Sequence, residues 1–217
     1  MKFVALVSGG KDSTLALYAT IKDGHELVAL ANLRPPNSDD TDSYMYQTVG
    51  QDAIQLYAEA IGVPLFQRVI SGTPINLTMK YTAVKGDEVE DLYQLLLDVR
   101  KSVQFDAVVS GAIESKYQYM RVKSICSRLG AEMISPMWHE DPLILLTLMI
   151  HEQINAILVK VCSYGLEPGK HLGKSITEVF EDLKRFHKNY GMHLCGEGGE
   201  YETLTLDCHL FKKRIVM

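Results

Sequence analysis

The chain contains 217 residues, of which 47% are hydrophobic and 23% are charged, so it is long enough for one soluble domain with its own core, or for a large domain with a small appendage. Its 22 lysines and arginines are outnumbered by 27 aspartates and glutamates, and the formal net charge is −5. Unspecific binding to nucleic acid or to an anionic membrane needs a basic surface, so this composition argues against both partners.

The cysteines and the N-terminus indicate the compartment. The four cysteines form no CxxC pair, which argues against a disulfide framework and a zinc ribbon. The apolar stretch at residues 3–7 is far shorter than the roughly 20 residues that span a bilayer, and no signal cleavage site follows it. We therefore expect a protein of the reducing cytoplasm without membrane contact.

Short apolar runs alternate with helix-spaced apolar residues along the chain. Runs that are apolar throughout are typical of strands buried on both faces, as in parallel sheets. We expect strands at residues 3–7, 26–33, 65–70, 105–109, 132–135, 156–161 and 203–206, and helices at residues 13–22, 43–61, 87–103, 115–129, 142–153 and 175–190.

This alternation predicts an α/β fold with a doubly wound, mostly parallel sheet, because right-handed crossovers place helices on both of its faces. Ligands of such folds bind beyond the carboxyl ends of the strands. A soft boundary near Trp138 predicts a nucleotide-binding domain at residues 1–138 and a smaller C-terminal substrate-binding domain at residues 139–217. Residues 35–42 are polar and proline-rich, and we expect a mobile loop there.

A glycine-rich segment between the first strand and the first helix is typical of a phosphate-binding loop. Helix N-terminal amides point outward at such a place, and the helix dipole favours an anion there. Glycines allow close backbone approach, serine hydroxyls donate hydrogen bonds, a lysine adds positive charge, and an aspartate caps the helix or helps to hold Mg²⁺. The segment consists of Ser8, Gly9, Gly10, Lys11, Asp12 and Ser13.

The segment fits neither the Walker A nor the GxGxxG pattern. It resembles the pyrophosphate loop of the N-type ATP pyrophosphatases. That resemblance implies that ATP is cleaved between its α and β phosphates, that AMP is transferred to a carboxyl or carbonyl oxygen, and that a nitrogen or sulfur nucleophile displaces it.

Further segments spread over nearly the whole chain narrow this resemblance. The sequence DSYMYQTVG at residues 42–50 and EGGEYET at residues 197–203 resemble the diphthine–ammonia ligase family, as do residues 29–35, 86–92, 111–113 and 121–122. The resemblance implies that the carboxylate of diphthine on translation elongation factor 2 is amidated with ammonium through an acyl-adenylate. The resemblance also implies that ATP is consumed, that Mg²⁺ is required, and that AMP and pyrophosphate are released. A homodimer is left open.

The site residues follow from the loop and from this resemblance. Lys11, Asp12 and Glu200 are expected in catalysis, with Asp12 as a candidate ligand of Mg²⁺. Besides residues 8–13, the strand exits are expected to line ATP with Ala31, Asn32, Leu33, Gly111, Ala112 and Ile113.

Diphthine carries a fixed quaternary ammonium, which favours aromatic faces and carboxylates. We therefore expect a cage for this cation, and a binding or deprotonation site for ammonium, among residues near the loops. Arg121 is a candidate contact to phosphate or carboxylate, although a surface salt bridge is nearly as good an interpretation. The substrate-binding residues expected are Tyr44, Tyr46, Tyr117, Arg121, Glu197, Gly198, Gly199, Glu200, Tyr201 and Glu202, with Tyr119 and Trp138 nearby.

Several alternatives stay open. Each tyrosine is also compatible with ordinary packing, and three glutamates within six residues are also compatible with a solvated turn. His193, Cys195, Cys208 and His209 lack the usual spacing of a zinc site, and Cys126 or Cys162 is a weak candidate nucleophile. A tRNA-modifying adenylating enzyme of the same superfamily is the runner-up, and a noncatalytic nucleotide sensor is a third possibility.

Overall fold

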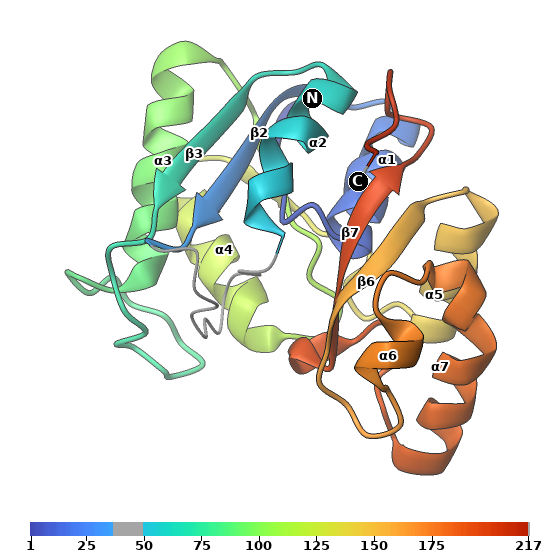
Figure 1. The fold of residues 1–217 in the computed structure, drawn as a ribbon. Coiled ribbons are helices and arrows are strands. Elements are labelled where there is room, and N and C mark those ends of the chain that lie inside the picture. The colour runs from blue at the N-terminus through green and yellow to red at the C-terminus, as the bar shows by residue number, and fades with distance from the viewer. Residues whose placement is uncertain (37–49, 217) are drawn as a thin grey trace.

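The computed structural model describes residues 1–36 and 50–216 (Figure 1). Five parallel strands form the main sheet in the order β3-β2-β1-β4-β5. These strands are β1 (Lys2–Leu6), β2 (Glu26–Arg34), β3 (Leu65–Val69), β4 (Ala107–Val109) and β5 (Glu132–Ile134). The predicted α/β class with a mostly parallel sheet is confirmed.

Four helices cover this sheet: α1 (Lys11–Lys22), α2 (Ile54–Ile61), α3 (Glu88–Ser102) and α4 (Lys116–Leu129). Successive side chains of a strand point to opposite faces, so β1 contributes to two cores. Phe3 and Ala5 pack in the cluster that contains α1 and α2 residues, whereas Val4 packs in the cluster that contains α3 and α4 residues. The sheet is therefore doubly wound, as predicted.

The C-terminal part forms a second, smaller layer. Its elements are α5 (Pro142–His151), β6 (Asn155–Val161), α6 (Pro168–His171), α7 (Ile176–Tyr190) and β7 (Tyr201–Asp207). Strands β6 and β7 pair antiparallel in a two-stranded sheet of their own. Figure 1 shows α5, α6 and α7 on the outer side of this pair, and β7 next to α1. The C-terminal strands therefore do not extend the parallel sheet.

The two parts share one hydrophobic core. Leu15 and Leu17 of α1 lie in the same buried cluster as Leu146 of α5 and Leu183 of α7. A predicted division at residue 138 thus crosses a continuous apolar cluster, and it stays a prediction.

Most expected strands and helices are present with ends shifted by one or two residues. The expected helix at residues 43–61 is shorter in its described part, where a 3-10 turn (Gln51–Ala53) leads into α2. Helix α6 was not predicted, because four residues are too few for a periodic pattern. No helix within residues 1–36 and 50–216 is both long enough and apolar enough to span a membrane.

Candidate active site

The phosphate loop, residues 8–13, leaves β1 at the carboxyl edge of the parallel sheet and begins α1. Gly9 has a φ of 81°, a left-handed conformation that favours glycine. Gly10 is the N-cap of α1, and as a glycine it has no side chain with which to cap the helix. Ser13 Oγ donates to Gly10 O at 3.1 Å, and the Gly10 amide donates to Ser8 Oγ at 3.3 Å. The result is an ordered glycine loop at a helix start, which is suited to an anion.

Strand β7 forms hydrogen bonds with the phosphate loop and the first turn of α1. The Thr205 amide donates to Gly9 O at 2.8 Å, and the Lys11 amide donates to Thr203 Oγ1 at 3.0 Å. Thr14 Oγ1 lies 3.0 Å from Thr205 Oγ1 and 2.9 Å from the Tyr57 hydroxyl. The sequence analysis did not predict a role for these threonines, although Thr203 ends the EGGEYET segment. The C-terminal part therefore helps to shape the nucleotide side of the site.

Lys11 and Asp12 form a close ion pair, with the ammonium 2.9 Å from the nearer carboxylate oxygen. The Lys11 side chain is only 2% exposed, whereas that of Asp12 is 32% exposed. Burial alone would lower the pKa of Lys11, but the charge of Asp12 raises it above its usual value. Asp12 is thus open to a ligand, while the lysine ammonium is enclosed, which differs from its predicted role as a phosphate contact.

The exits of β2 and β4 adjoin the phosphate loop. Asn32 is buried and donates from Nδ2 to Val7 O at 2.9 Å, so its side chain holds the end of β1. Ala31 and Leu33 are buried in the core, which leaves only backbone for a nucleotide contact there. A Cβ at Gly111 would lie 3.1 Å from the Ser13 nitrogen. The β4 exit therefore approaches the start of α1 so closely that a Cβ at residue 111 would require the backbone there to shift by a few tenths of an ångström.

The acidic loop, residues 193–200, crosses from the C-terminal part to the β4 exit. Glu197 Oε1 accepts the Ile113 and Glu114 amides at 3.3 and 3.4 Å. Burial and the nearby charge of Asp12 raise the pKa of the Glu197 carboxyl. Gly196 has a φ of 71°, and a Cβ there would lie 2.7 Å from the Tyr201 ring. The loop thus holds Glu197 against the backbone of the predicted ATP-lining residue Ile113, near enough to Asp12 for the two charges to interact.

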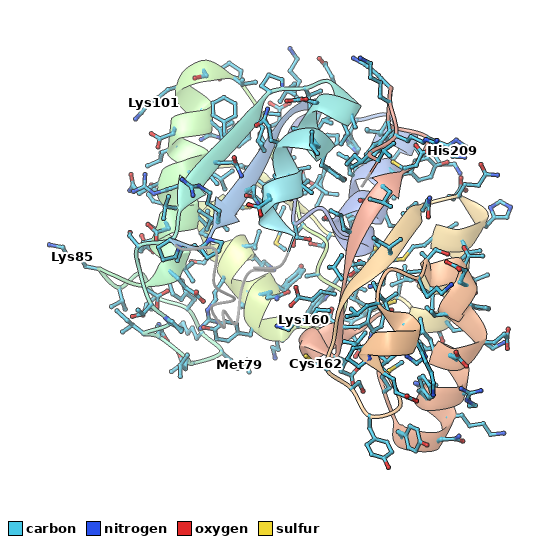
Figure 2. All side chains as sticks on the ribbon, viewed as in Figure 1. Met79, Lys85, Lys101, Lys160, Cys162 and His209 are labelled. Carbon is cyan, nitrogen blue, oxygen red and sulfur yellow. The ribbon has the colours of Figure 1, made fainter. Side chains whose placement is uncertain are left out.

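The other residues of the EGGEYET segment have different positions. Glu200 Oε2 accepts the His193 amide at 2.7 Å, which closes the acidic loop on itself. Glu202 lies 3.6 Å from the Lys160 ammonium. Figure 2 shows Lys160 and Cys162 at the end of β6 that meets the acidic loop, where the Cys162 amide donates to Glu200 O at 2.8 Å.

Tyr201 does not line an open cage. It is 2% exposed, its hydroxyl donates to Leu194 O at 2.6 Å, and its ring centroid lies 4.8 Å from the Lys11 ammonium. The ring is enclosed in this structure, and its predicted place against the substrate cation stays a prediction. The ring faces a cation of the protein itself.

Arg121 is likewise a structural residue. It is fully buried, and its guanidinium lies 3.1 Å from the Tyr117 ring centroid and donates to the backbone oxygens of Asn76, Thr78 and Tyr117. The Arg121 guanidinium therefore holds the loop at residues 71–87, and the predicted contacts of Arg121 and Tyr117 with substrate stay predictions. That distant loop left no signal in the sequence around Arg121.

The remaining predicted aromatic residues divide into two groups. Tyr119 and Trp138 stack on each other at 4.1 Å between ring centroids. Tyr44 and Tyr46 lie outside the described residues.

Gly198 and Gly199 of the acidic loop are exposed and both have positive φ, in a 3-10 turn (Glu197–Gly199).

The cysteine thiols give little support to thiolate chemistry. Burial raises the pKa of Cys126 and Cys195 to about 12 and that of Cys208 to about 11. Cys162 is the exposed one of the four. Within residues 1–36 and 50–216, no three histidine, cysteine, aspartate or glutamate side chains gather as metal ligands.

The parallel sheet, the glycine loop at its carboxyl edge and the helix start that follows it define a nucleotide-binding α/β protein with a phosphate-binding loop. Residues 1–133 match the family described as diphthamide synthase N-terminal domain, and residues 141–217 match the diphthamide synthase C-terminal domain. The chain therefore belongs to the diphthamide synthase family.

Relatives with established names agree with this assignment over the full chain. The diphthine–ammonia ligase of Danio rerio is 50% identical over 220 residues, which cover 100% of this chain and 86% of the relative. The enzyme of the same name from Homo sapiens is 48% identical and 83% covered. That of Schizosaccharomyces pombe is 48% identical, but this chain covers only 36% of its length.

Proposed function

We propose that the protein is an ATP-dependent ligase that amidates the carboxylate of diphthine on translation elongation factor 2 with ammonium. The products are diphthamide, AMP and pyrophosphate, and an acyl-adenylate is the intermediate. Membership of the diphthamide synthase family supports the reaction. The observation that carries the proposal is the contact between an anion-binding loop and an acidic loop, because the reaction needs a phosphate site beside a site for cations.

The nucleotide side of the site is built from backbone. The amides and hydroxyls of residues 8–13 suit the pyrophosphate part of ATP, and the exits of β2 and β4 suit its remainder. Asp12 is the partly exposed carboxylate of this loop, and it fits Mg²⁺, which proteins commonly hold through one or two carboxylates together with substrate phosphates. A bound Mg²⁺ would neutralise phosphate charge.

The acidic loop supplies the acceptor side. Ammonium must lose a proton before its nitrogen can attack the adenylated carboxyl. Glu197 suits this role better than Glu200, which was expected in catalysis without a stated role. Burial and the charge of Asp12 raise the pKa of Glu197, and its Oε1 lies at the β4 exit, whereas Glu200 closes its own loop. Glu197 and Asp12 together also suit the binding of a cation. Adenylation of the diphthine carboxylate is needed because a carboxylate oxygen is a poor leaving group, whereas AMP is a good one.

The partners and the compartment follow from this reaction. Ammonium and the diphthine-bearing elongation factor are the substrates, and the reducing cytoplasm suits a chain with four free cysteines. The buried, protonated thiols disfavour the tRNA-thiolation alternative, which calls for a reactive cysteine or a metal-binding set. A homodimer stays a prediction.

The test combines the protein with ATP, Mg²⁺, ammonium and elongation factor 2 that bears diphthine. AMP is quantified, and the modified histidine is weighed by mass spectrometry. Conversion of the carboxylate to the amide, with one AMP for each amide, supports the proposal. AMP formation on tRNA without this mass change contradicts it.

A further inference from the structure

Lys11 belongs to the phosphate loop by sequence, but its side chain is turned into the protein. Its ammonium donates to both Asp12 oxygens at 3.1 and 2.9 Å and to Cys195 O at 2.5 Å. The Tyr201 ring closes over it at 4.8 Å, and the lysine side chain is only 2% exposed. An anion bound at the surface of the loop has no route to this ammonium without displacing the tyrosine or the acidic loop.

We infer that Lys11 is a positioning residue rather than a phosphate ligand: its buried ammonium ties the phosphate loop to the acidic loop. The effect of Lys11 on catalysis rests on the proposed function, whereas its link between the two loops does not. Lys11 orients the partly exposed carboxylate of Asp12 on one side and fixes the backbone at Cys195 on the other.

The contacts around Lys11 form a closed set. The backbone amide of Lys11 donates to Thr203 Oγ1, so the same residue is fixed to β7 at its main chain and to the acidic loop at its side chain. The acidic loop then reaches the β4 exit through Glu197, which accepts the Ile113 and Glu114 amides. We therefore expect a change at Lys11 to move Asp12 and Glu197, the two carboxylates that we propose bind ammonium.

Arginine substitution separates the two roles of the lysine. A guanidinium binds phosphate at least as well as an ammonium, so a phosphate ligand tolerates Lys11→Arg. The space around the ammonium is filled by Asp12, Cys195 and Tyr201, so a larger head group forces the acidic loop away. Lys11→Met removes the charge altogether. Lys22→Met is the matched control, because Lys22 ends the same helix, is 62% exposed and pairs with Glu152 outside the site.

The experiment measures the ATP dissociation constant by calorimetry and the steady-state parameters for ammonium with the full chain. We expect both Lys11 variants to bind ATP within about threefold of the wild type, while kcat falls by about tenfold or more and KM for ammonium rises. Weakening of ATP binding by about tenfold or more in Lys11→Met, with normal activity in Lys11→Arg, would overturn the inference. Lys22→Met is expected to match the wild type.

Hydrogen exchange provides a readout that does not depend on the reaction. ATP is expected to slow amide exchange in residues 193–200 of the wild type and of Lys22→Met, but not of Lys11→Met or Lys11→Arg. Retained protection in both Lys11 variants, or its absence in the wild type, contradicts the coupling. If the wild type binds ATP and shows this protection but forms no amide, the proposed function fails while the coupling stands.

Discussion

Gly111 offers the sharpest test of how the sheet exits build the nucleotide site. A Cβ added there would lie 3.1 Å from the Ser13 nitrogen and 3.2 Å from the Asp12 carbonyl carbon. Both are backbone atoms at the start of α1, so neither can rotate away as a flexible side chain would. We expect Gly111→Ala to push the β4 exit away from the phosphate loop.

The size of the effect follows from this contact. Overpacking against a fixed structure costs about 1–3 kcal/mol, which in a chain of this size lowers the midpoint of thermal unfolding by about 2–4 °C for each kcal/mol. If part of the strain is relieved by separating the two loops, ATP binding weakens, since each 1.4 kcal/mol or so is a factor of about ten in the dissociation constant.

Gly169→Ala is the matched control. Gly169 lies in α6, its added Cβ meets nothing within 4 Å, and its φ is not in the left-handed region. Calorimetric ATP titration and thermal unfolding are measured for both variants. We expect a normal ATP affinity for Gly169→Ala and a clear loss for Gly111→Ala. Equal ATP affinities and equal unfolding temperatures in the two variants would refute the reasoning about close approach.

Three further predictions follow. Glu197→Gln should lower kcat by about 100-fold or more and remove the acidic limb of the pH–rate profile. In the wild type this limb arises because protonation of Glu197, whose pKa is raised, removes the base. An unchanged profile would exclude Glu197 as the base. The raised pKa of Glu197 also affects stability. The protonated carboxyl stabilises the fold fully below the usual glutamate pKa, and this stabilisation is lost as the pH rises through the raised pKa of the folded protein. Glu197→Gln should therefore unfold at a higher temperature than the wild type near neutral pH. Arg121→Met removes the donor to the backbone oxygens of Asn76 and Thr78, which costs about 1–3 kcal/mol of folding free energy for each. Proteolysis within residues 71–87 should become faster, while the affinity for ATP stays normal. A loss of ATP affinity would instead indicate that Arg121 belongs to the active site. In a thiol-reagent titration of the native protein, Cys162 should react and the three buried cysteines should react only after unfolding; fast modification of a second thiol would contradict their burial.

The fold was largely predictable because the central strands of the parallel sheet, β1, β2 and β4, are buried on both faces. Such strands appear in the sequence as continuous apolar runs, and the helices between them carry a clear periodic pattern. Strands β6 and β7 also appeared as strands, but nothing in their composition shows that they pair with each other and not with the main sheet. Pairing depends on contacts between residues about 50 positions apart in sequence, as between Asn155 and Asp207.

The candidate site was predictable where its chemistry lies in consecutive residues. The glycines and hydroxyls at residues 8–13 follow each other because a tight turn at a helix start needs them there. Glu197 was also predicted, since it lies in a segment with two adjacent glycines. The roles expected of Tyr201 and Arg121 stay predictions. Both side chains are buried in this structure, and because both residues are amphipathic, the sequence does not show whether they face a ligand or the protein.

The sequence by itself thus determined the α/β class, the phosphate loop and the family, because each depends on local patterns or on motifs that a short segment carries in full. Only the tertiary structure decided which way Lys11 points, that β7 supports the phosphate loop, and that Glu197 lies near enough to Asp12 for the two charges to interact. These three features depend on the burial of a charge and on contacts between residues 11–14 and 195–205. The burial of Lys11 and its contacts with Cys195 and Tyr201 are not visible until distant segments are brought together, although Asp12, which offsets the cost of desolvation, is the next residue in the sequence.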